Sequence, residues 1–484
     1  MGYIERIPMP DKLLPYLILS TLFLTLVIAK YASDPLRRIP GPFLARYASF
    51  WLHYHAWAGT QCSAIQALHA RYGPVVRIAP NDVHISDGEA LWPIYMDKGG
   101  MVKSQYYNTF DIDGHATVFT TLELSKRAGR LKAIQSMFSF GATAAAKGVI
   151  QECAARMIER LGAARESHSK TVDVLNLTRS YALDAVSAYV LGAPYNSLQE
   201  VGEGMSASPF VDFFVGMSRF FHVSKPVCNV IERVLDVVKP DYAMRESSRV
   251  VDAYLVETVE AKMRQRAEGK DDGSYPARLL GVGLSREQVV AECKDAVFAG
   301  TDSTGNNLAT ILWHLAAQPE IYAKLHAEIV QNDAGENKDG QALPYLSGVV
   351  KEALRLSMAI SCRLPRVVPA GGFSHADVYI PAGTNVGLSA YQLHLDAAVF
   401  SEPHEFRPER WVQASAQMQR DFMPFGKGAR ACIARNLAML ELYVATEAVV
   451  KSGVLEGAKT TVDRIESLEW FNARVKSGTI ELVW

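Results

Sequence analysis

The segment FMPFGKGARACIARN, residues 422–436, constrains the fold more than any other stretch, because it sets one cysteine between a glycine-rich turn and a helical run. Gly426 and Gly428 permit a tight loop whose backbone N–H groups can approach the sulfur of Cys432 and hold it as a thiolate. The following helix would direct the positive end of its dipole toward the same sulfur. Cys432 is therefore a candidate metal ligand; a small core residue and half of a disulfide are the alternatives.

The remaining cysteines bear on that choice. Six cysteines are spread singly along the chain, with no CxxC motif and no paired spacing. This pattern speaks against a disulfide framework and against a zinc site, and it suits a reducing compartment. We expect the other five to be buried as small hydrophobic residues: Cys62, Cys153, Cys228, Cys293 and Cys362.

The composition indicates a globular protein with a large core. Apolar residues make up 49% of the 484 residues and charged residues 21%, and the net charge is -1. Nothing in this balance argues for binding to nucleic acid. Helix-compatible runs dominate from about residue 120 to 360, and short alternating runs are few.

The N-terminal region is different, since residues 13–29, LLPYLILSTLFLTLVIA, carry no charge. A helix of this length reaches about 25 Å, close to the thickness of a thin bilayer. No small-residue cleavage site follows, so we expect a retained anchor; a buried core helix is the alternative. Lys30, Arg37 and Arg38 follow the segment, and this positive bias predicts that residues 30–484 lie in the cytosol.

The sequence Ile39-Pro40-Gly41-Pro42 cannot continue a helix and is expected to form a stiff hinge. We therefore divide the chain into four parts: a short lumenal tail (1–12), a transmembrane anchor (13–30), a basic, proline-rich hinge (31–42) and a catalytic domain (43–484).

The residues FGKGARACIA, Phe425 to Ala434, resemble the haem-binding signature FxxGxRxCxG of the cytochrome P-450 superfamily. The match holds at every position except the last, where Ala434 replaces the usual glycine and adds a methyl group near the cofactor. A phosphate-binding loop does not fit, because no strand precedes the segment and no Lys-Ser/Thr ends it. The resemblance implies a mainly α fold with a small β lobe, preceded by one N-terminal transmembrane helix, and haem b as cofactor.

The same resemblance assigns roles around the cofactor. Cys432 would be the fifth ligand of the haem iron, Phe425 would shield one side of the flat ring, and Arg430 would pair with a propionate. The segment LPRVVP resembles the family stretch whose arginine, here Arg366, reaches the second propionate.

Two further motifs stand in the family order. Glu352 and Arg355 lie three residues apart on one helix face, and FRPERW follows about 50 residues later with Arg410. This order resembles the family's buried Glu-Arg-Arg network, which holds the core behind the haem and does no chemistry.

The stretch AGTDST, residues 299–304, contains poor helix formers inside a helical pattern that runs from a Ser285-xx-Gln288 capping box to about Ala317. In the family this is the distal helix, where an irregular turn makes room for dioxygen beside Ala299. Asp302 and Ser303 would relay protons through water, and Thr304 is the next candidate for this role. The family usually has Thr where Ser303 stands, and serine keeps the hydroxyl but not the methyl group that fixes the rotamer.

In SKRAGRLKAIQSMFS the family commonly has Trp or His followed four residues later by a basic residue. Counted back from Phe138, these positions are Arg127 and Leu131, so the second departs from the pattern. Arg130, one residue earlier, is expected to take over the propionate contact. A plain solvated basic face is the alternative.

The resemblance covers about residues 38–484, and the anchor and hinge resemble the microsomal, eukaryotic type. The segment 119–139, FTTLELSKRAGRLKAIQSMFS, is similar to the corresponding segment of filamentous-fungal family members that act in specialised metabolism. The resemblance implies a monooxygenase in the endoplasmic reticulum membrane that uses dioxygen and takes electrons from a separate NADPH–cytochrome reductase, with cytochrome b5 as a second possible donor. Five basic residues on the cysteine side could attract the reductase, with ordinary surface charges as the alternative: Lys126, Arg127, Lys132, Lys427 and Arg435.

Two other functions are compatible with haem-thiolate ligation, namely an isomerase or dehydratase that does not use dioxygen, and a haem sensor or electron carrier. The acid–alcohol pair Asp302 and Ser303 speaks against both. The aromatic run in 205–225 suits a bulky apolar substrate; insertion of this stretch into the bilayer is the alternative. The substrate pocket is expected to include the 100–120 loop, the 205–225 stretch, Ala299, residues 360–364 and the tail near Phe471.

Overall fold

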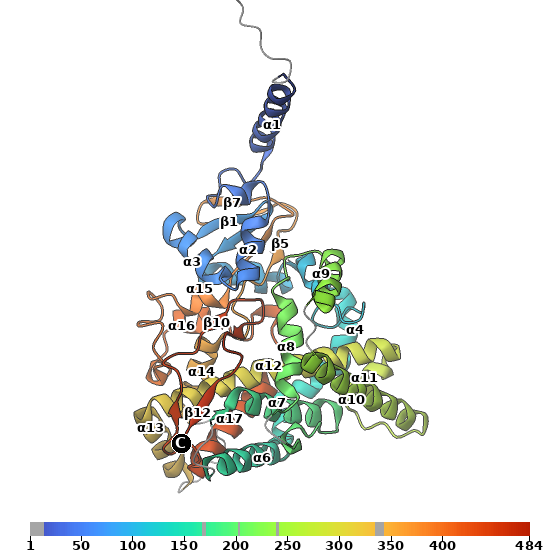
Figure 1. Ribbon diagram of the computed structural model, residues 1–484, viewed down its shortest axis with the longest axis vertical. Helices are drawn as coiled ribbons and strands as arrows, with labels where there is room; N and C mark the ends of the chain where they lie inside the picture. Colours follow the sequence, from blue (N-terminus) through green and yellow to red (C-terminus); the bar gives the residue numbers. More distant parts are fainter. Residues whose placement is uncertain (1–13, 167–170, 202–203, 239–241, 334–342) are drawn as a thin grey trace, which may run out of the picture.

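The uncharged N-terminal run forms helix α1, Leu14–Ser33, which stands away from the rest of the protein (Figure 1). Its hydrophobic side chains are exposed, Tyr16 to 71% and Phe23 to 68%. A core helix would bury them, so the core-helix alternative is wrong; α1 is long and apolar enough to cross a membrane. The helix extends beyond residue 30, the expected end of the anchor.

The predicted lumenal tail lies outside the residues described by this computed structural model, which are 14–166, 171–201, 204–238, 242–333 and 343–484.

Much of the segment predicted as a hinge, 31–42, packs on the globular part. Ile39 is buried, and Asp34 forms an ion pair with Arg77. A Cβ on Gly41 would lie 2.1 Å from the carbonyl oxygen of Arg77, so only glycine permits this close approach. These contacts hold the stretch against the globular part, so it does not form a separate hinge.

A small sheet lies near the base of α1 (Figure 1). Its strand order is β1-β2-β8-β5-β3; β2 and β8 are parallel, and the other pairs are antiparallel. The strands are β1 Val75–Ala79, β2 Asp82–Ile85, β3 Val102–Lys103, β5 Arg366–Val367 and β8 Asn385–Gly387. The smaller sheets pair β4 Val172–Asp173 and β9 Lys459–Thr460 with β12 Glu481–Val483, β6 Phe373–His375 with β7 Val378–Ile380, and β10 Ser467–Leu468 with β11 Arg474–Val475.

The rest of the described chain is mainly helical, which confirms the expected fold class. These helices are α2 Phe50–Ala58, α3 Gln61–Tyr72, α4 Leu124–Ile134, α5 Phe140–Ala145, α6 Lys147–Glu166, α7 Val174–Leu191, α8 Ala207–Ser218, α9 Lys225–Val238, α10 Tyr242–Ala267, α11 Tyr275–Gly281, α12 Arg286–Ala317, α13 Pro319–Asp333, α14 Pro344–Ser357, α15 Ala390–His394, α16 Ala416–Asp421 and α17 Arg435–Ser452.

Helix α12 crosses the middle of the helical part and packs most extensively against α7 (Figure 1). It begins at the predicted capping box, in which the side chains of Ser285 and Gln288 each accept from the other's backbone N–H. It ends at Ala317, ahead of Pro319, as predicted.

The expected irregular turn at residues 299–304 is not present, since α12 runs through the stretch without a break. The hydroxyls of Thr301 and Ser303 donate to the carbonyls four residues earlier, at 2.7 and 2.8 Å. Packing on both sides therefore outweighs the poor helix propensity of these residues.

Candidate active site

The Cys432 loop has the geometry that its glycines suggest. Gly426 and Gly428 have φ of +66° and +71°, a region that side chains rarely adopt. At Gly428 space is also limiting, because a Cβ would lie 1.8 Å from the carbonyl oxygen of Tyr95. The N–H of Cys432 donates to the carbonyl of Phe425 at 2.8 Å and closes the loop.

Cys432 is exposed, whereas the other five cysteines are buried as expected. Burial by surrounding protein nevertheless raises the pKa of the Cys432 thiol, while the N–H of Ala434 and the nearby Arg435 lower it. The thiol of Cys432 is therefore open to a space that the surrounding protein encloses, as a ligand site requires. Ala434 has φ −88° and ψ 15°, a backbone conformation open to any residue, so alanine causes no strain here.

Four cationic side chains gather beside this loop. Lys103 on β3 lies directly opposite Arg366 on β5, and Arg127 donates to the carbonyl of Ala429 at 3.2 Å, next to Arg430. Burial, followed by Arg366, Arg430 and Arg127, lowers the pKa of Lys103 well below its ordinary value. Burial, Arg127 and Arg366 likewise lower the pKa of Arg430 to about 10. We call these four residues the cation cluster.

Among the described residues, no carboxylate forms an ion pair with any member of the cation cluster; they donate to backbone carbonyls and, from Arg366, to the hydroxyl of Tyr107. Like charges that face each other across a sheet are destabilising, and a buried charge without a partner is costly. The cluster therefore fits a ligand with two carboxylates, such as the propionates of haem, beside a sulfur that can bind iron.

Arg130 is placed elsewhere. It forms an ion pair with the buried carboxylate of Glu292 at 3.0 Å and donates to the carbonyl of Ala116. In this structure the guanidinium of Arg130 is therefore directed to Glu292 and not to the Cys432 loop, and its contact with a propionate stays a prediction. Arg127, by contrast, is buried and donates to a carbonyl of the Cys432 loop.

Open surface in the middle of α12 lies on one face. Ala299 is exposed and Ser303, one turn later, is half-buried, although most of the surrounding helix is buried. The hydroxyl of Ser303 donates to the carbonyl of Ala299 at 2.8 Å. Space therefore adjoins these two residues, where the sequence predicts the distal side of the cofactor.

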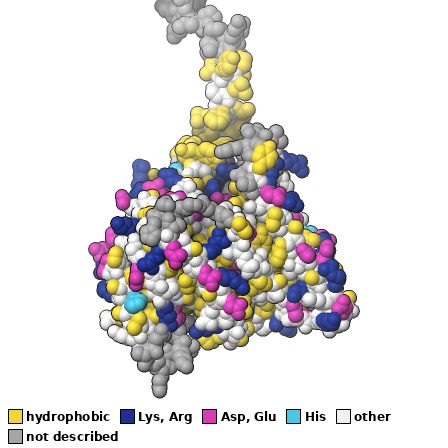
Figure 2. Space-filling view, turned by 60° about the horizontal axis from the view of Figure 1, so that its bottom comes forward, with side chains coloured by type: hydrophobic (Ala, Val, Ile, Leu, Met, Phe, Trp, Pro, Cys, Tyr) yellow, Lys and Arg dark blue, Asp and Glu magenta, His cyan; other side chains and the backbone are white. Residues whose placement is uncertain are grey.

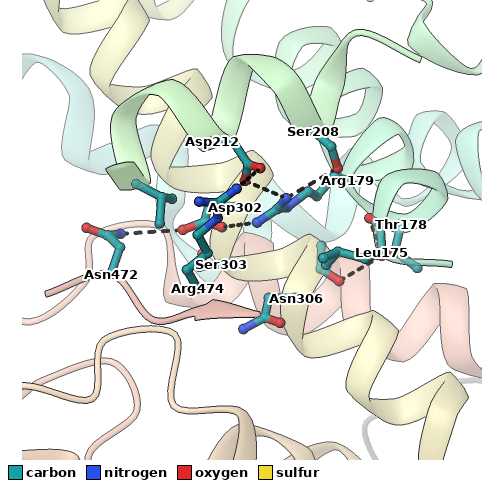
Figure 3. A network of polar contacts seen from close by, with 12 residues as sticks. Leu175, Thr178, Arg179, Ser208, Asp212, Asp302, Ser303, Asn306, Asn472 and Arg474 are labelled. Carbon is teal, nitrogen blue, oxygen red and sulfur yellow. Dashed lines mark hydrogen bonds and ion pairs between the residues drawn. The ribbon is translucent and has the colours of Figure 1, made fainter. Parts of the chain in front are cut away.

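The carboxylate of Asp302 is turned toward α7 and α8 (Figure 3). Arg179 donates to it at 3.1 Å and to Asp212 at 3.3 Å, and Asn472 lies 3.5 Å from its second oxygen. Arg474 binds Asp212 at 2.8 Å. Burial raises the pKa of Asp302, whereas Arg179 lowers it. In this conformation Asp302 belongs to a buried ion-pair network and does not reach the open face of α12.

Thr304 is buried and lies against Glu441 of α17, away from the open face. Burial raises the pKa of Glu441 to about 8, and the nearby Thr304 hydroxyl lowers it. Glu441 is therefore largely protonated at neutral pH.

The predicted Glu-Arg-Arg network is confirmed. Arg355 binds both oxygens of Glu352 at 3.0 and 2.8 Å, and Arg410 binds one of them at 2.9 Å. Both members of the Glu352–Arg355 pair are fully buried. The indole N–H of Trp411 adds a further bond at 2.8 Å.

Four of the predicted pocket walls meet in one aromatic cluster. Phe110 and Phe119 come from the 100–120 loop, and Phe221 lies in the second predicted wall. Phe471, from the C-terminal tail, has its ring centroid 4.3 Å from that of Phe221. Leu364 packs against the same cluster.

Two residues of the site escaped the sequence analysis. Lys103 lies in a two-residue strand that carries no pattern, and its partner Arg366 is distant in the chain. Arg179 was detectable in principle, since an arginine within the apolar helical run VLNLTRSYALDAV signals a buried ion pair.

Comparisons with known proteins agree with this geometry. The family model described as cytochrome P-450 matches residues 40–466. The cytochrome P-450 monooxygenase mfmF of Annulohypoxylon moriforme is 34% identical over 96% of this chain and 98% of its own. The N-acetyltryptophan 6-hydroxylase ivoC of Emericella nidulans is 29% identical over 96% of each chain. A pisatin demethylase of Fusarium vanettenii is 27% identical over 92% of this chain and 88% of its own.

Proposed function

This chain belongs to the cytochrome P-450 family and is a haem-dependent monooxygenase, and from that premise we propose that it oxygenates a bulky, largely apolar small molecule in fungal specialised metabolism. The exposed thiol of Cys432 beside four cations without carboxylate partners is the observation that carries the proposal.

The residues described above fit haem b. Cys432 would bind the iron, the cation cluster would hold the two propionates, and Phe425 would cover the ring beside the sulfur. The N–H of Ala434 would stabilise the thiolate. When bound, the haem supplies dioxygen activation with two electrons, favoured by electron donation from the thiolate.

We infer that Ser303 and Asp302 deliver protons to the distal side. The Ser303 hydroxyl borders the open face of α12, where it can turn from the Ala299 carbonyl to a water molecule. Asp302 is linked through Arg179 and Asp212 to Arg474, whose side chain is 31% exposed. Because arginine stays protonated, the Asp302 carboxylate itself would carry the proton, by turning from Arg179 to a water molecule beside Ser303.

The aromatic cluster supports the proposed substrate class. Its rings come from segments far apart in the chain; Phe221 and Phe471 are buried, whereas Phe110 and Phe119 are half-buried and keep part of their apolar surface open. These side chains would orient the substrate and exclude water, while the oxygen chemistry belongs to the cofactor.

A membrane location is supported by α1 and by the elements that follow it. Phe43, Phe50 and Trp57 are exposed to 68%, 76% and 58%. Figure 2 shows hydrophobic side chains along α1 and at its junction with the globular part, whereas charged side chains spread over the remaining visible surface. We propose that this end rests on the endoplasmic reticulum membrane, with residues 30–484 in the cytosol.

Electrons would come from a membrane-bound NADPH–cytochrome reductase, with cytochrome b5 as a second donor. Lys126, Lys132 and Arg435 are exposed on the cysteine side and can attract an acidic partner. Arg127 is buried in the cation cluster and is therefore removed from this surface.

Reconstitution of the full chain with NADPH–cytochrome reductase tests the proposal. Candidate aromatic and polycyclic compounds would be supplied with isotopically labelled dioxygen, and products analysed by mass spectrometry. We expect a product that carries one labelled oxygen atom and forms only with NADPH. A rearranged product that forms without NADPH or dioxygen would contradict the proposal and establish the isomerase alternative.

A further inference from the structure

Two buried cysteines, Cys62 and Cys362, are in contact although they are 300 residues apart in the chain. Their sulfur atoms are 3.6 Å apart, and the two residues are only 1% and 2% exposed. Cys62 is the second residue of α3, and Cys362 lies in the irregular stretch between α14 and β5. A disulfide needs its sulfurs about 2.0 Å apart, so a shift of about 1.5 Å in this irregular stretch would allow the bond to form.

The hydrogen bonds around the pair direct the two sulfurs toward each other. The sulfur of Cys362 lies 3.2 Å from the carbonyl oxygen of Trp470 and 3.3 Å from that of Glu469. A thiol has one hydrogen, so a Cys362 thiol that donates to either carbonyl can only accept from Cys62. The hydroxyl oxygen of Ser361 lies 3.7 Å from the sulfur of Cys62.

Both cysteines belong to the aromatic cluster, whose rings include Phe221 and Phe471. Ile360 and Leu364, on either side of Cys362, pack against the same cluster. A bond between the two cysteines would therefore tie this segment of the proposed pocket wall to α3.

The protonation state of Cys62 limits which oxidant can act on the pair. Burial, followed by Cys362 and Glu469, raises the pKa of the Cys62 thiol well above its ordinary value, so the thiol stays protonated at neutral pH. A buried, protonated thiol reacts slowly with oxidants in bulk solution. An oxidant that acts on this pair must therefore arise close to it.

A haem-dependent monooxygenase supplies such an oxidant. When dioxygen takes up two electrons and two protons and no substrate is oxygenated, the product is hydrogen peroxide. The aromatic cluster adjoins the cation cluster, because Arg366 donates to the hydroxyl of Tyr107 at 3.3 Å. Peroxide released at the haem therefore has a short path to the two cysteines.

We propose that Cys62 and Cys362 are a redox-active dithiol that hydrogen peroxide from uncoupled turnover converts into a disulfide. One thiol is first oxidised to a sulfenic acid, with release of water. The second thiol then attacks that sulfur, and the hydroxyl group leaves with the thiol proton as water. Two thiols and one hydrogen peroxide thus give one disulfide and two water molecules.

The inference needs monooxygenase activity but not the proposed substrate class. Disulfides in the cytosol are mostly transient and redox-sensing, so we expect a reductant to reverse this bond. The competing explanation is that the two cysteines only fill space in the core, as small hydrophobic residues.

The experiment uses the full-length holoprotein with NADPH–cytochrome reductase, NADPH and dioxygen, and without substrate, so that electrons pass to hydrogen peroxide. Catalase is present throughout and removes peroxide from bulk solution. Free thiols are then blocked at low pH, the protein is digested, and mass spectrometry measures the fraction of the Cys62 peptide that is linked to the Cys362 peptide. The controls are a sample with carbon monoxide, which blocks the haem iron, and Cys153→Ala, at another buried cysteine.

We expect the linked fraction to rise with the NADPH consumed, to rise equally in Cys153→Ala, and to be suppressed by carbon monoxide. The bond closes a loop of about 300 residues, so it should raise the apparent midpoint of thermal unfolding by about 5 °C. A phosphine reductant should reverse that shift. Cys62→Ser and Cys362→Ala should show no shift after turnover, and the linked-peptide measurement on the wild-type protein does not depend on either variant.

Absence of the linked peptide after NADPH has been consumed would overturn the inference and leave the two cysteines as core residues. A linked fraction that carbon monoxide does not reduce would also contradict it, because the oxidant would not come from the haem. A thermal shift of the same size in Cys62→Ser would assign the stabilisation to another site.

Discussion

Glu352 is the acceptor at the centre of a buried network, and its removal should abolish stable haem loading. Its two oxygens accept bonds from Arg355, Arg410, Trp411 and the backbone N–H of Arg407, at 2.8 to 3.0 Å. Arg355 is fully buried and also donates to three backbone carbonyls, which fix its position. If Glu352 is removed, the guanidinium of Arg355 therefore cannot move into solvent.

The cost can be worked from these contacts. Glu352→Ala leaves the buried Arg355 charge uncompensated, at about 3–5 kcal/mol. The indole N–H of Trp411 and the N–H of Arg407 each lose an acceptor, at about 1–3 kcal/mol where water does not replace it. A folded domain has a total free energy of unfolding of about 5–15 kcal/mol, so these costs together are a large fraction of its stability. Glu352→Gln keeps the shape and two acceptor lone pairs, so it should be intermediate.

The assay is haem content per polypeptide, with the carbon monoxide spectrum and the urea midpoint of unfolding measured on the same samples. Lys324→Ala is the matched control, because it breaks a surface ion pair with Glu409 whose side chains are 57% and 47% exposed. That change should cost about 0–1 kcal/mol. A fully haem-loaded Glu352→Ala protein with the midpoint of Lys324→Ala would refute the reasoning.

Three further predictions follow from the site. Ser303→Ala should keep substrate binding and reduction but divert electrons to hydrogen peroxide, whereas Ser303→Thr should be tolerated. Asp302→Asn should slow turnover by about 10–100-fold. The measurement is product formed per NADPH consumed, and unchanged coupling in both Ser303→Ala and Asp302→Asn would show that other residues deliver the protons. Burial and then the neighbouring arginines lower the pKa of Lys103 well below its ordinary value, more than Asp295 raises it; a bound dicarboxylate raises the pKa further and so favours uptake of a proton by Lys103. Haem affinity of the apoprotein should therefore fall as pH rises through the pKa of Lys103 in the complex, and an equal slope in Lys103→Met would contradict this. A protein beginning at Ser33 should leave the membrane fraction in high salt and still bind haem, because Asp34 and its contact with Arg77 remain; loss of the haem spectrum would show that α1 is needed for the fold.

The parts that the sequence predicts well are those with local constraints. The Cys432 loop depends on two glycines with positive φ, and the capping box of α12 lies within four residues. The Glu352 network was recognisable because its members occur in a characteristic order. In each case the residues themselves limit the geometry.

The parts that the sequence does not predict depend on distant contacts. The repulsion between Lys103 and Arg366 arises only when β3 pairs with β5. Arg130 stands one residue before the family's basic position, 131, and on a helix one residue turns a side chain by about 100°, so Arg130 contacts Glu292, whereas Arg127 contacts the Cys432 loop. Local propensity suggests a break at residues 299–304, yet packing keeps α12 continuous.

The spectrum of the reduced protein with carbon monoxide tests the assignment of Cys432 as the iron ligand most directly. We expect the Soret band at the thiolate-type position in the wild-type protein and in Cys153→Ala, which alters a buried cysteine. Cys432→Ser should lose that band, either because haem is no longer held or because the band moves to another position. A thiolate-type band that persists in Cys432→Ser would contradict the account.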